Sequence, residues 1–102
     1  MRVVKVAATA EQDLQDILEY VSQNNLPAAD KLIRDIVRKF AFLRDNPQAG
    51  ILRSRLMINL RSFVTRNYFI FYLPIENGIE ILRVLHSSRD IEAIFEEFFD
   101  SI

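Results

Sequence analysis

The side chains that could carry out chemistry in this sequence are arginines, tyrosines and one histidine. They are concentrated in the second half of the chain, at Arg53, Arg55, Arg61, Arg66, Tyr68, Tyr72, Arg83, His86 and Arg89. Cleavage of a phosphodiester needs an acid, a base and cations that stabilise the transition state. Arg61, Arg83 and His86 could supply these functions if the fold brought them together.

His86 has a second interpretation, which we favour. Its ring would be half-buried, with one ring nitrogen bonded to the turn that precedes a final helix. Metal binding is not expected, because the sequence has no cysteine and no second histidine to complete a set of ligands. We expect neither a metal nor a cofactor.

Arg61 and Arg83 lie near the two ends of a predicted strand meander. If both point the same way, they could bind a phosphate or a carboxylate through paired hydrogen bonds. The alternative is an ordinary ion pair, for example with Glu80 or Asp90, and such pairs contribute little to stability when exposed.

Charge is unevenly distributed along the chain. Thirteen basic and fourteen acidic residues give a net charge of -1, which is poor support for direct binding to nucleic acid. Residues 46–75 nevertheless contain Arg53, Arg55, Arg61 and Arg66 and no acid, whereas the last helix is acidic. We expect this basic edge to bind a partner that is acidic or is itself bound to nucleic acid.

The elements that must position these residues begin with the stretch Leu60–Asp90. Three segments rich in aromatic and β-branched residues, separated by Thr65–Asn67 and by a turn ending in Asn77-Gly78, predict an antiparallel meander. Asn and Gly tolerate the positive φ of a tight hairpin. Both alternating sides of Tyr68–Leu73 are largely apolar, so something must cover each face of the sheet.

Two amphipathic helices precede the meander. A capping box at Thr9–Gln12 predicts the start of the first, and Asn25 or Leu26 followed by Pro27 predicts the start of the second. Asn46-Pro47 ends the second helix. The predicted core stripes are Leu14, Ile17, Leu18 and Val21, then Ala29, Leu32, Ile33, Ile36, Val37, Phe40 and Leu43. The short link between the helices predicts an antiparallel hairpin on one face of the sheet.

The remaining segments complete the fold. Residues 2–6 suit a short edge strand, and the loop 44–59 contains a possible strand at Leu56–Ile58. Ser87 and Asp90 have the spacing of a capping box before a final amphipathic helix. Its apolar residues are Ile91, Ile94, Phe95, Phe98, Phe99 and Ile102. We expect this helix to cover the other sheet face, although its end, with Phe98 and Phe99, could also meet a partner.

Length and composition indicate one domain over residues 1–102, since the chain has 102 residues and half are apolar. The predicted fold class is α/β (α+β), with an N-terminal helical hairpin on a twisted antiparallel sheet and a short C-terminal helix. No apolar run reaches the length of a membrane span, and the N-terminal run is too short for a signal peptide. We therefore expect a cytoplasmic protein.

Several short stretches, in this order and spacing, resemble the ParE branch of the RelE/ParE toxin superfamily. They are Asp13-Leu14 with Ile17 and Tyr20, Ala28-Ala29, Phe40–Leu43 with Pro47 and Gly50, Leu60–Phe63, Tyr68 with Ile70–Tyr72, and Gly78–His86 with Arg89-Asp90. The resemblance covers nearly the whole chain. It implies the plasmid-stabilising toxin half of a type II toxin–antitoxin pair, with a helical hairpin packed on a twisted sheet.

The resemblance also implies partners. A ParD-like antitoxin, of ribbon-helix-helix or similar type, would neutralise the toxin by folding its C-terminal segment around it. ParE-like toxins typically poison DNA gyrase, whereas RelE-like relatives cut messenger RNA on the ribosome. Contact with nucleic acid would then be indirect, through gyrase or the antitoxin bound to its operator.

Two features favour binding over cleavage. RelE-like relatives tend to be markedly basic and to end soon after the last strand, whereas this chain is slightly acidic and continues into a helix. We therefore expect no catalytic residues. If the protein is instead a ribonuclease, the catalytic residues would be Arg61, Arg83 and His86. The expected partner-binding residues are Arg53, Arg55, Arg61, Arg66, Arg83, Arg89, Phe98 and Phe99. A third hypothesis is a non-toxic protein that acts only as an antitoxin-binding corepressor.

Overall fold

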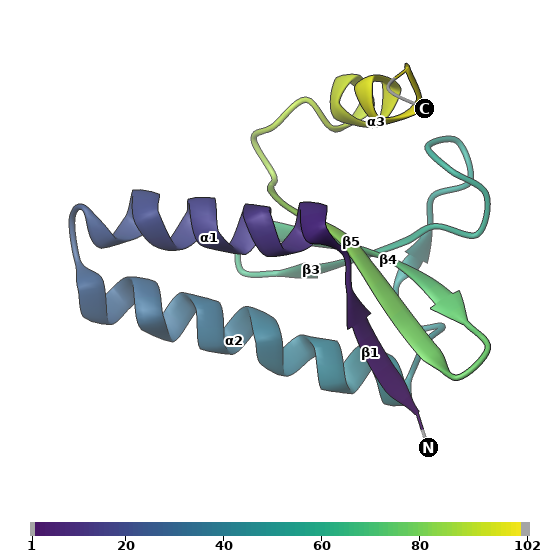
Figure 1. Cartoon of the computed structure of the whole chain (residues 1–102), viewed down its shortest axis with the longest axis horizontal. Coiled ribbons are helices and arrows are strands. Elements are labelled where there is room, and N and C mark those ends of the chain that lie inside the picture. Colours follow the sequence, from purple (N-terminus) through teal and green to yellow (C-terminus); the bar gives the residue numbers. More distant parts are fainter. Residues whose placement is uncertain (1, 101–102) are drawn as a thin grey trace.

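The computed structural model describes the backbone of residues 2–100 and the side chains of residues 2–97. Within this range the chain forms a short first strand, a helical hairpin, the other four strands of one sheet and a last helix (Figure 1). The elements are β1 (Val3–Val6), α1 (Ala8–Ser22), α2 (Leu26–Asp45), β2 (Ile51–Leu52), β3 (Arg61–Thr65), β4 (Tyr68–Ile75), β5 (Gly78–His86) and α3 (Ile91–Asp100). The predicted α+β class, the helical hairpin and the last helix are confirmed.

The strands form one sheet in the order β1-β5-β4-β3-β2. The predicted meander is the antiparallel part, in which β3, β4 and β5 are neighbours. Strand β1 is the expected edge strand, but it runs parallel to β5, so the sheet is mixed. The pattern of a short strand does not specify the direction of a neighbour that lies more than seventy residues later in the chain.

Gly78 is where β1 and the β4–β5 hairpin meet. Its φ is +150°, and a Cβ on this residue would lie 1.8 Å from the carbonyl oxygen of Val3. The expectation of positive φ in this hairpin therefore holds for Gly78, whereas Asn77 is not among the positive-φ residues. A side chain at Gly78 would separate β1 from β5.

The strand predicted at Leu56–Ile58 is wrong, because the loop contributes β2 at Ile51–Leu52 instead. Residues 53–60 fold as turns in which the carbonyl of Arg53 accepts from the backbone N–H of Leu56, at 2.9 Å. Leu56 and Met57 then pack on the core beneath α3. These residues are apolar because they are buried, although they lie in a turn. A short apolar run in a sequence looks the same whether it forms a buried turn or a strand.

The helix caps follow the prediction only in part. Asn25 caps α2 by accepting from the N–H of Ala28 at 3.0 Å. The capping box at Thr9 is wrong, because α1 begins after Ala7 and the Thr9 hydroxyl donates to the carbonyl of Leu82 at 2.7 Å. At α3 the cap is Asp90, which accepts from the N–H of Ala93, so the box predicted from Ser87 is also wrong. The Thr9 side chain, which would suit a cap, instead makes a contact with β5.

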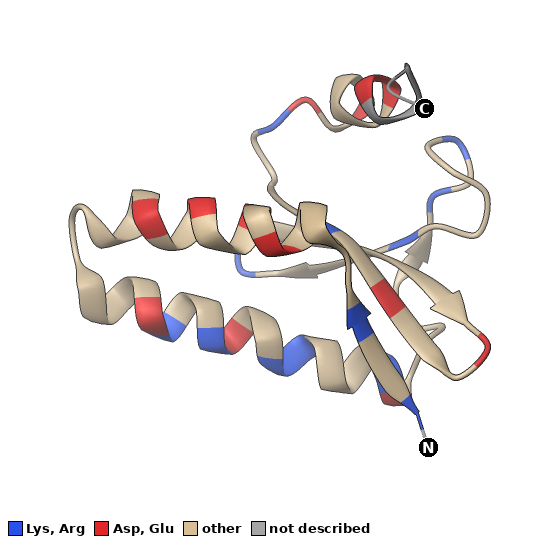
Figure 2. Ribbon diagram, in the orientation of Figure 1, with Lys and Arg blue, Asp and Glu red and all other residues tan. Residues whose placement is uncertain are grey.

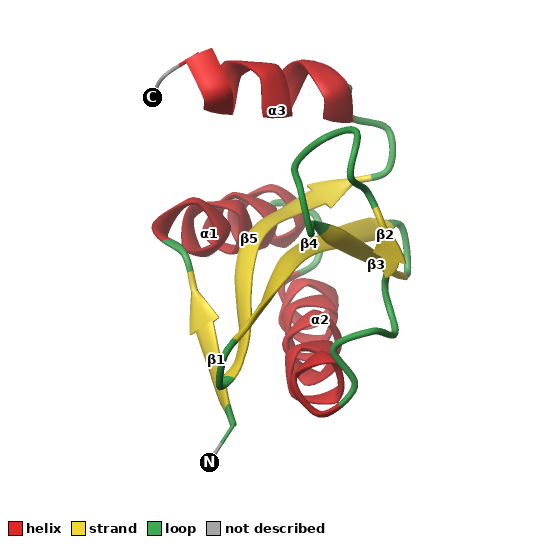
Figure 3. Ribbon diagram, turned by 90° about the vertical axis from the view of Figure 1, so that its right-hand side faces the viewer, coloured by secondary structure: helices red, strands yellow, loops and turns green. Residues whose placement is uncertain are grey.

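The helical hairpin covers one face of the sheet (Figures 1 and 3). Buried residues from both layers form this first core: Ala10, Leu32, Ile36, Phe40, Leu43, Ile70, Tyr72, Ile79, Ile81 and Val84. Leu18 and Val37, predicted to be buried, are 36% and 43% exposed. They lie at the margins of the stripes, beyond the width of surface that the sheet covers.

Helix α3 lies on the opposite face of the sheet, as expected (Figure 3). Its anchor is Phe95, which is 2% exposed and meets the ring of Phe71 edge-on with 5.0 Å between centroids. The side chains of Phe98 and Phe99 and all of Ile102 lie outside the described part of the chain. Within the described residues no helix is long and apolar enough to cross a membrane.

Candidate functional site

The three residues that would be catalytic only in a ribonuclease, Arg61, Arg83 and His86, do not come together. Arg61 lies opposite Tyr72 on β4, whereas His86 lies opposite Tyr68. These two positions on β4 are four residues apart, about 13 Å at the rise of a strand. An acid at one position and a cation at the other could not act on the same phosphate without a large movement of the chain.

Arg83 is held by the carboxylate of Asp13, a residue that the sequence placed in the family resemblance but not beside Arg83. Its Nε and Nη2 donate to Asp13 at 2.8 and 2.9 Å, and the same carboxylate accepts from the backbone N–H of Val84 at 2.9 Å. These hydrogen bonds, which Arg83 donates to the Asp13 carboxylate, raise the pKa of Arg83. The alternative of an ion pair was therefore the right one for Arg83, but the partner is neither Glu80 nor Asp90. An acid on the apolar face of α1, beside Leu14, was the available signal for this contact.

His86 adopts the favoured arrangement. Its Nδ1 accepts from the backbone N–H of Ser88 at 3.0 Å and lies 2.8 Å from the Ser88 hydroxyl. Its ring meets Tyr68 edge-on, with 5.1 Å between centroids. Burial raises the pKa of Tyr68. These contacts fix the histidine ring at the end of β5.

A hollow of about 390 Å³ lies beside His86, between α1 and the end of β5. The residues that line it are Asp13, Asp16, Ile17, Tyr20, Tyr68, Val84, Leu85, His86, Ser88 and Arg89. Arg61 is not among them, and the guanidinium of Arg83 is occupied by Asp13. The hollow therefore contains one of the three proposed catalytic groups.

Arg61 braces the loop that leads into β2. Its Nη1 donates to the carbonyls of Gly50 at 2.8 Å and Gln48 at 3.4 Å. The Tyr72 hydroxyl holds the same loop, because it donates to the carbonyl of Pro47 at 2.9 Å and accepts from the N–H of Gly50 at 2.8 Å. Burial raises the pKa of Tyr72. Arg61 and Tyr72 therefore both hold the backbone of the Pro47–Gly50 loop in place.

Arg53 has a different environment from the other arginines. Its guanidinium carbon lies 5.7 Å from the ring centroids of both Phe69 and Phe71, and its Nη1 donates to the Ser62 hydroxyl at 3.1 Å. No carboxylate among residues 2–97 forms an ion pair with it. A partly buried guanidinium is therefore held in place while most of its donors are not used within the described chain.

Arg55, Arg66 and Arg89 are exposed. Arg66 pairs with Asp35 on α2, and this hydrogen bond lowers the pKa of Asp35. Arg55 lines a groove of about 220 Å³ with Leu56, Glu92, Phe95 and Glu96 of the loop and of α3. The basic segment and the acidic last helix predicted from the sequence therefore meet at this groove, and Figure 2 shows the blue loop near the red of α3.

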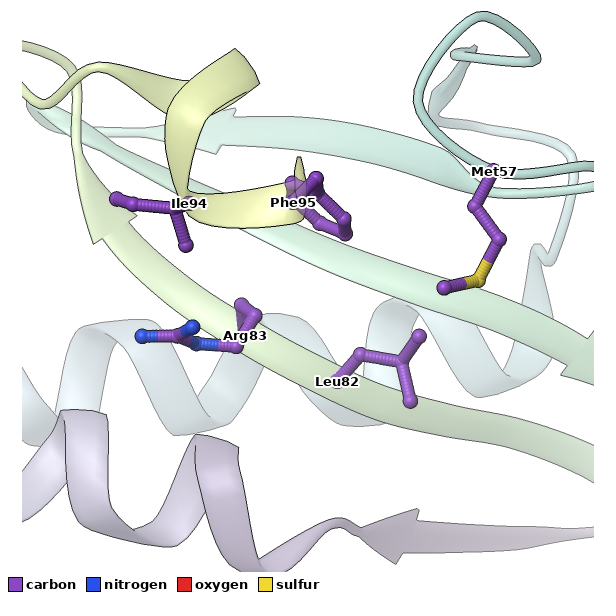
Figure 4. Close-up of a pocket in the computed structure, with 5 residues that line it drawn as sticks. All are labelled: Met57, Leu82, Arg83, Ile94 and Phe95. Atoms are coloured by element: carbon purple, nitrogen blue, oxygen red, sulfur yellow. The ribbon is translucent and has the colours of Figure 1, made fainter. Parts of the chain in front are cut away.

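The space beneath α3 is closed. Met57, Leu82, Arg83, Ile94 and Phe95 surround a cavity of about 10 Å³, in which Ile94 and Phe95 point from α3 towards the sheet (Figure 4). This is about the space that one water molecule needs. Among the described residues no cluster of His, Cys, Asp or Glu could hold a metal ion. The contact between α3 and the sheet is thus a packed core.

A protein-family model described as "ParE toxin of type II toxin-antitoxin system, parDE" matches residues 4–91 of this sequence. The chain belongs to this ParE toxin family. The resemblance found in the sequence is therefore confirmed, and the family assignment covers every described element up to the start of α3.

Two solved structures share the fold of this ParE family member. A chain of the chromosomal ParDE system from P. aeruginosa is 24% identical with a TM-score of 0.71, and the match covers 84% of this chain and 96% of that chain. A chain of the YoeB-YefM complex from Staphylococcus aureus is 20% identical with a TM-score of 0.56, and covers 84% and 97% respectively. No curated protein sequence matches significantly.

Proposed function

We propose that this ParE-family toxin inhibits DNA gyrase by binding to it, and that a ParD-like ribbon-helix-helix antitoxin neutralises it. The family match over residues 4–91 carries the proposal. The proposed location is the cytoplasm, where topoisomerases act on DNA. We expect the toxin itself to bind gyrase without a metal or a cofactor of its own.

The arrangement of the candidate catalytic groups supports binding rather than cleavage of RNA. Arg83 is paired with Asp13, Arg61 with backbone carbonyls, and His86 with Ser88. A general acid or base must reach the proton that it transfers, directly or through one water. In this fold Arg61 and His86 would need to approach each other by roughly 10 Å before they could share a substrate.

The neutralising partner is proposed from the family and its structural neighbours. The P. aeruginosa structure is of a ParDE system, and the S. aureus structure is of a YoeB-YefM complex. An antitoxin segment that is disordered alone and folds on the toxin would cover a large surface for its length. Such a segment needs exposed apolar and charged side chains on the toxin, and both occur at the β2–β3 edge.

The test is a DNA supercoiling assay with purified gyrase, with and without the antitoxin encoded beside this protein. We expect relaxed or cleaved DNA to accumulate, and the antitoxin to reverse the effect. Unchanged gyrase together with codon-specific cuts in translated messenger RNA would instead establish a ribonuclease, and alanine at Arg61, Arg83 and His86 would be the next variants. Normal growth on induced expression, with antitoxin binding retained, would indicate a corepressor.

A further inference from the structure

One end of the sheet face that carries α3 is not covered by any element in the described part of the chain. Helix α3 packs over Leu60, Phe71 and Leu85. Towards β2 on this face, Val64 is 54% exposed and Ile51 is 71% exposed. Phe69 and Phe71 belong to the core beneath α3. Val64 lies opposite Phe69, Ser62 opposite Phe71, and Ile51 opposite Ser62, so these side chains are on the same face of the sheet.

Arg53 stands at the centre of this surface, which we call the edge surface and define as Ile51, Arg53, Val64 and Phe69. Its guanidinium lies over Phe69 and Phe71 and is oriented by the Ser62 hydroxyl. A planar guanidinium fixed in this way loses little freedom when a carboxylate binds. Its position between apolar side chains also strengthens the hydrogen bonds that it would make.

The backbone at this edge favours an extended ligand. The N–H of Arg53 donates to the carbonyl of Leu60 at 2.7 Å, so Leu60, Ser62 and Val64 are the residues of this strand whose backbone groups point towards β2. Strand β2 begins at Ile51, opposite Ser62, and does not extend as far as Val64. The outward N–H and C=O of Val64 therefore face no strand in the described part of the chain, and they are open to a peptide that adds to the sheet.

Charge selects the kind of peptide. Of the four arginines in residues 46–75, a segment with no acidic residue, Arg53 lies on the edge surface and Arg55 lies nearby. Arg61 is bonded to the Gln48–Gly50 loop and Arg66 to Asp35, so Arg53 is the cation that this surface offers among the described residues. We propose that the edge surface binds an extended peptide segment with acidic and apolar side chains, a carboxylate of which is held by Arg53 and flanked by Ile51 and Val64. This inference rests on the proposed function, in which the segment belongs to the antitoxin.

A nucleic-acid ligand fits the same surface less well. The groove beside it presents Glu92 and Glu96 of α3 together with Arg55. A phosphate backbone carries a charge on every nucleotide and would be repelled by these carboxylates, whereas a peptide can place a single carboxylate at Arg53 and uncharged side chains near α3. The net charge of -1 adds no long-range attraction for nucleic acid. Unpaired bases bind best on aromatic platforms. Ile51 and Val64 offer aliphatic contacts, and the ring of Phe69 lies under the Arg53 guanidinium.

The experiment measures affinity for the full-length antitoxin encoded beside this protein, with Ile51→Asp and Arg53→Gln as the test variants. Each variant should raise the Kd about tenfold or more. Ile51→Asp places a negative charge against the acidic peptide, and Arg53→Gln removes the cation that binds its carboxylate. Arg53→Lys should weaken binding less than Arg53→Gln, because it keeps the charge. The matched control is Leu26→Asp, at a leucine that is 63% exposed at the start of α2, and its Kd should stay within about twofold.

Two further measurements make the outcomes distinct. On binding, the amide of Val64 should gain protection from hydrogen exchange, and overlapping antitoxin peptides that bind should carry net negative charge. Tight binding by wild type with no loss in Ile51→Asp and Arg53→Gln overturns the edge surface and leaves the proposed function standing. No binding by wild type overturns the antitoxin as partner. RNA that competes for the wild type but not for Arg53→Gln would assign the surface to nucleic acid instead.

Discussion

At the scale of single residues, the contact between Asp13 and Arg83 joins α1 to β5 across seventy positions of sequence. The Asp13 side chain is 10% exposed and that of Arg83 is 21% exposed, so water screens the pair only weakly. Asp13 also satisfies the backbone N–H of Val84. One carboxylate therefore carries an ion pair and a buried backbone donor at the place where the helical hairpin meets the sheet.

We predict that Asp13→Ala destabilises the fold by about 3 kcal/mol, because it leaves a partly buried guanidinium and a backbone N–H without a partner. Urea unfolding followed by circular dichroism measures the loss. Asp16→Asn, an exposed change on the same helix, should stay within about 0.5 kcal/mol of wild type. The double variant Asp13→Leu with Arg83→Met should recover part of the loss. Equal stability of Asp13→Ala and wild type would contradict this account.

A second residue-scale prediction concerns Tyr72 and pH. Burial raises the pKa of its hydroxyl above the usual value, so folding favours the protonated form. Its contribution is therefore complete below pH 10, the usual tyrosine pKa, and is lost as pH rises through the higher folded value. Tyr72→Phe should cost about 1–2 kcal/mol at pH 7, because the N–H of Gly50 loses its acceptor.

Urea midpoints at pH 8 and pH 10.5 test the titration of Tyr72. Wild type should lose more stability over this interval than Tyr72→Phe does. Tyr68, whose pKa burial also raises, should leave a residual slope in the variant. Identical slopes in the two proteins would show that Tyr72 does not carry the alkaline loss.

At the scale of elements, the two cores differ in how they are closed. The first core lies between the helical hairpin and the sheet, whereas the second depends on the single helix α3 and on two turn residues, Leu56 and Met57. A short helix whose buried residue among those described is Phe95 separates from a sheet more easily than a hairpin with two long apolar stripes. Helix α3 is thus the element whose attachment can change while the rest of the domain stays folded.

We predict that Phe95→Ala releases α3 without unfolding the hairpin and sheet. The substitution removes the ring that packs on Phe71, with a cost of about 3 kcal/mol that falls mainly on the attachment of α3. Amide hydrogen exchange should show lost protection in α3 and in Leu56–Leu60, with α2 and β4 unchanged. Glu96→Ala, next to it but exposed, is the control. A uniform loss of protection across all elements would show instead that the two cores unfold as one.

The sequence predicts these elements more reliably than their ends and partners. Apolar periodicity and the turn at Asn77-Gly78 define the hairpin and the meander, because both are local patterns. The errors at Thr9 and Leu56 share one cause, since each side chain is used by a contact that is distant in sequence. The same limit applies to the site, because nothing near Arg83 in sequence indicates that Asp13 binds it.

At the scale of the whole molecule, charge is separated although the total is close to zero. Helix α1 has acidic residues and no basic one, while residues 46–75 have arginines and no acid (Figure 2). Such a protein is weakly charged at long range but presents a positive edge at short range. A partner with an acidic segment would be oriented towards this edge before contact, provided that salt does not screen the field.

We predict that association with the antitoxin slows several-fold as ionic strength rises from about 0.05 to 0.5 M, because the Debye length then falls to a few ångströms. Arg55→Glu should lower the association rate constant several-fold at low salt and little at high salt. Its dissociation rate should change by less than about twofold, since Arg55 is an exposed residue beside the edge surface. Stopped-flow or surface-plasmon measurements separate the two rates.

The control is Lys31→Glu, an exposed position on α2 that changes the net charge by the same amount. If only net charge mattered, both variants would slow association equally at every ionic strength. If the positive edge orients the partner, Arg55→Glu should have the larger effect and the flatter salt dependence, because it removes the local field that the acidic segment approaches. Equal effects of the two variants would therefore place the encounter elsewhere on the molecule, even if Arg53 still held the carboxylate in the final complex.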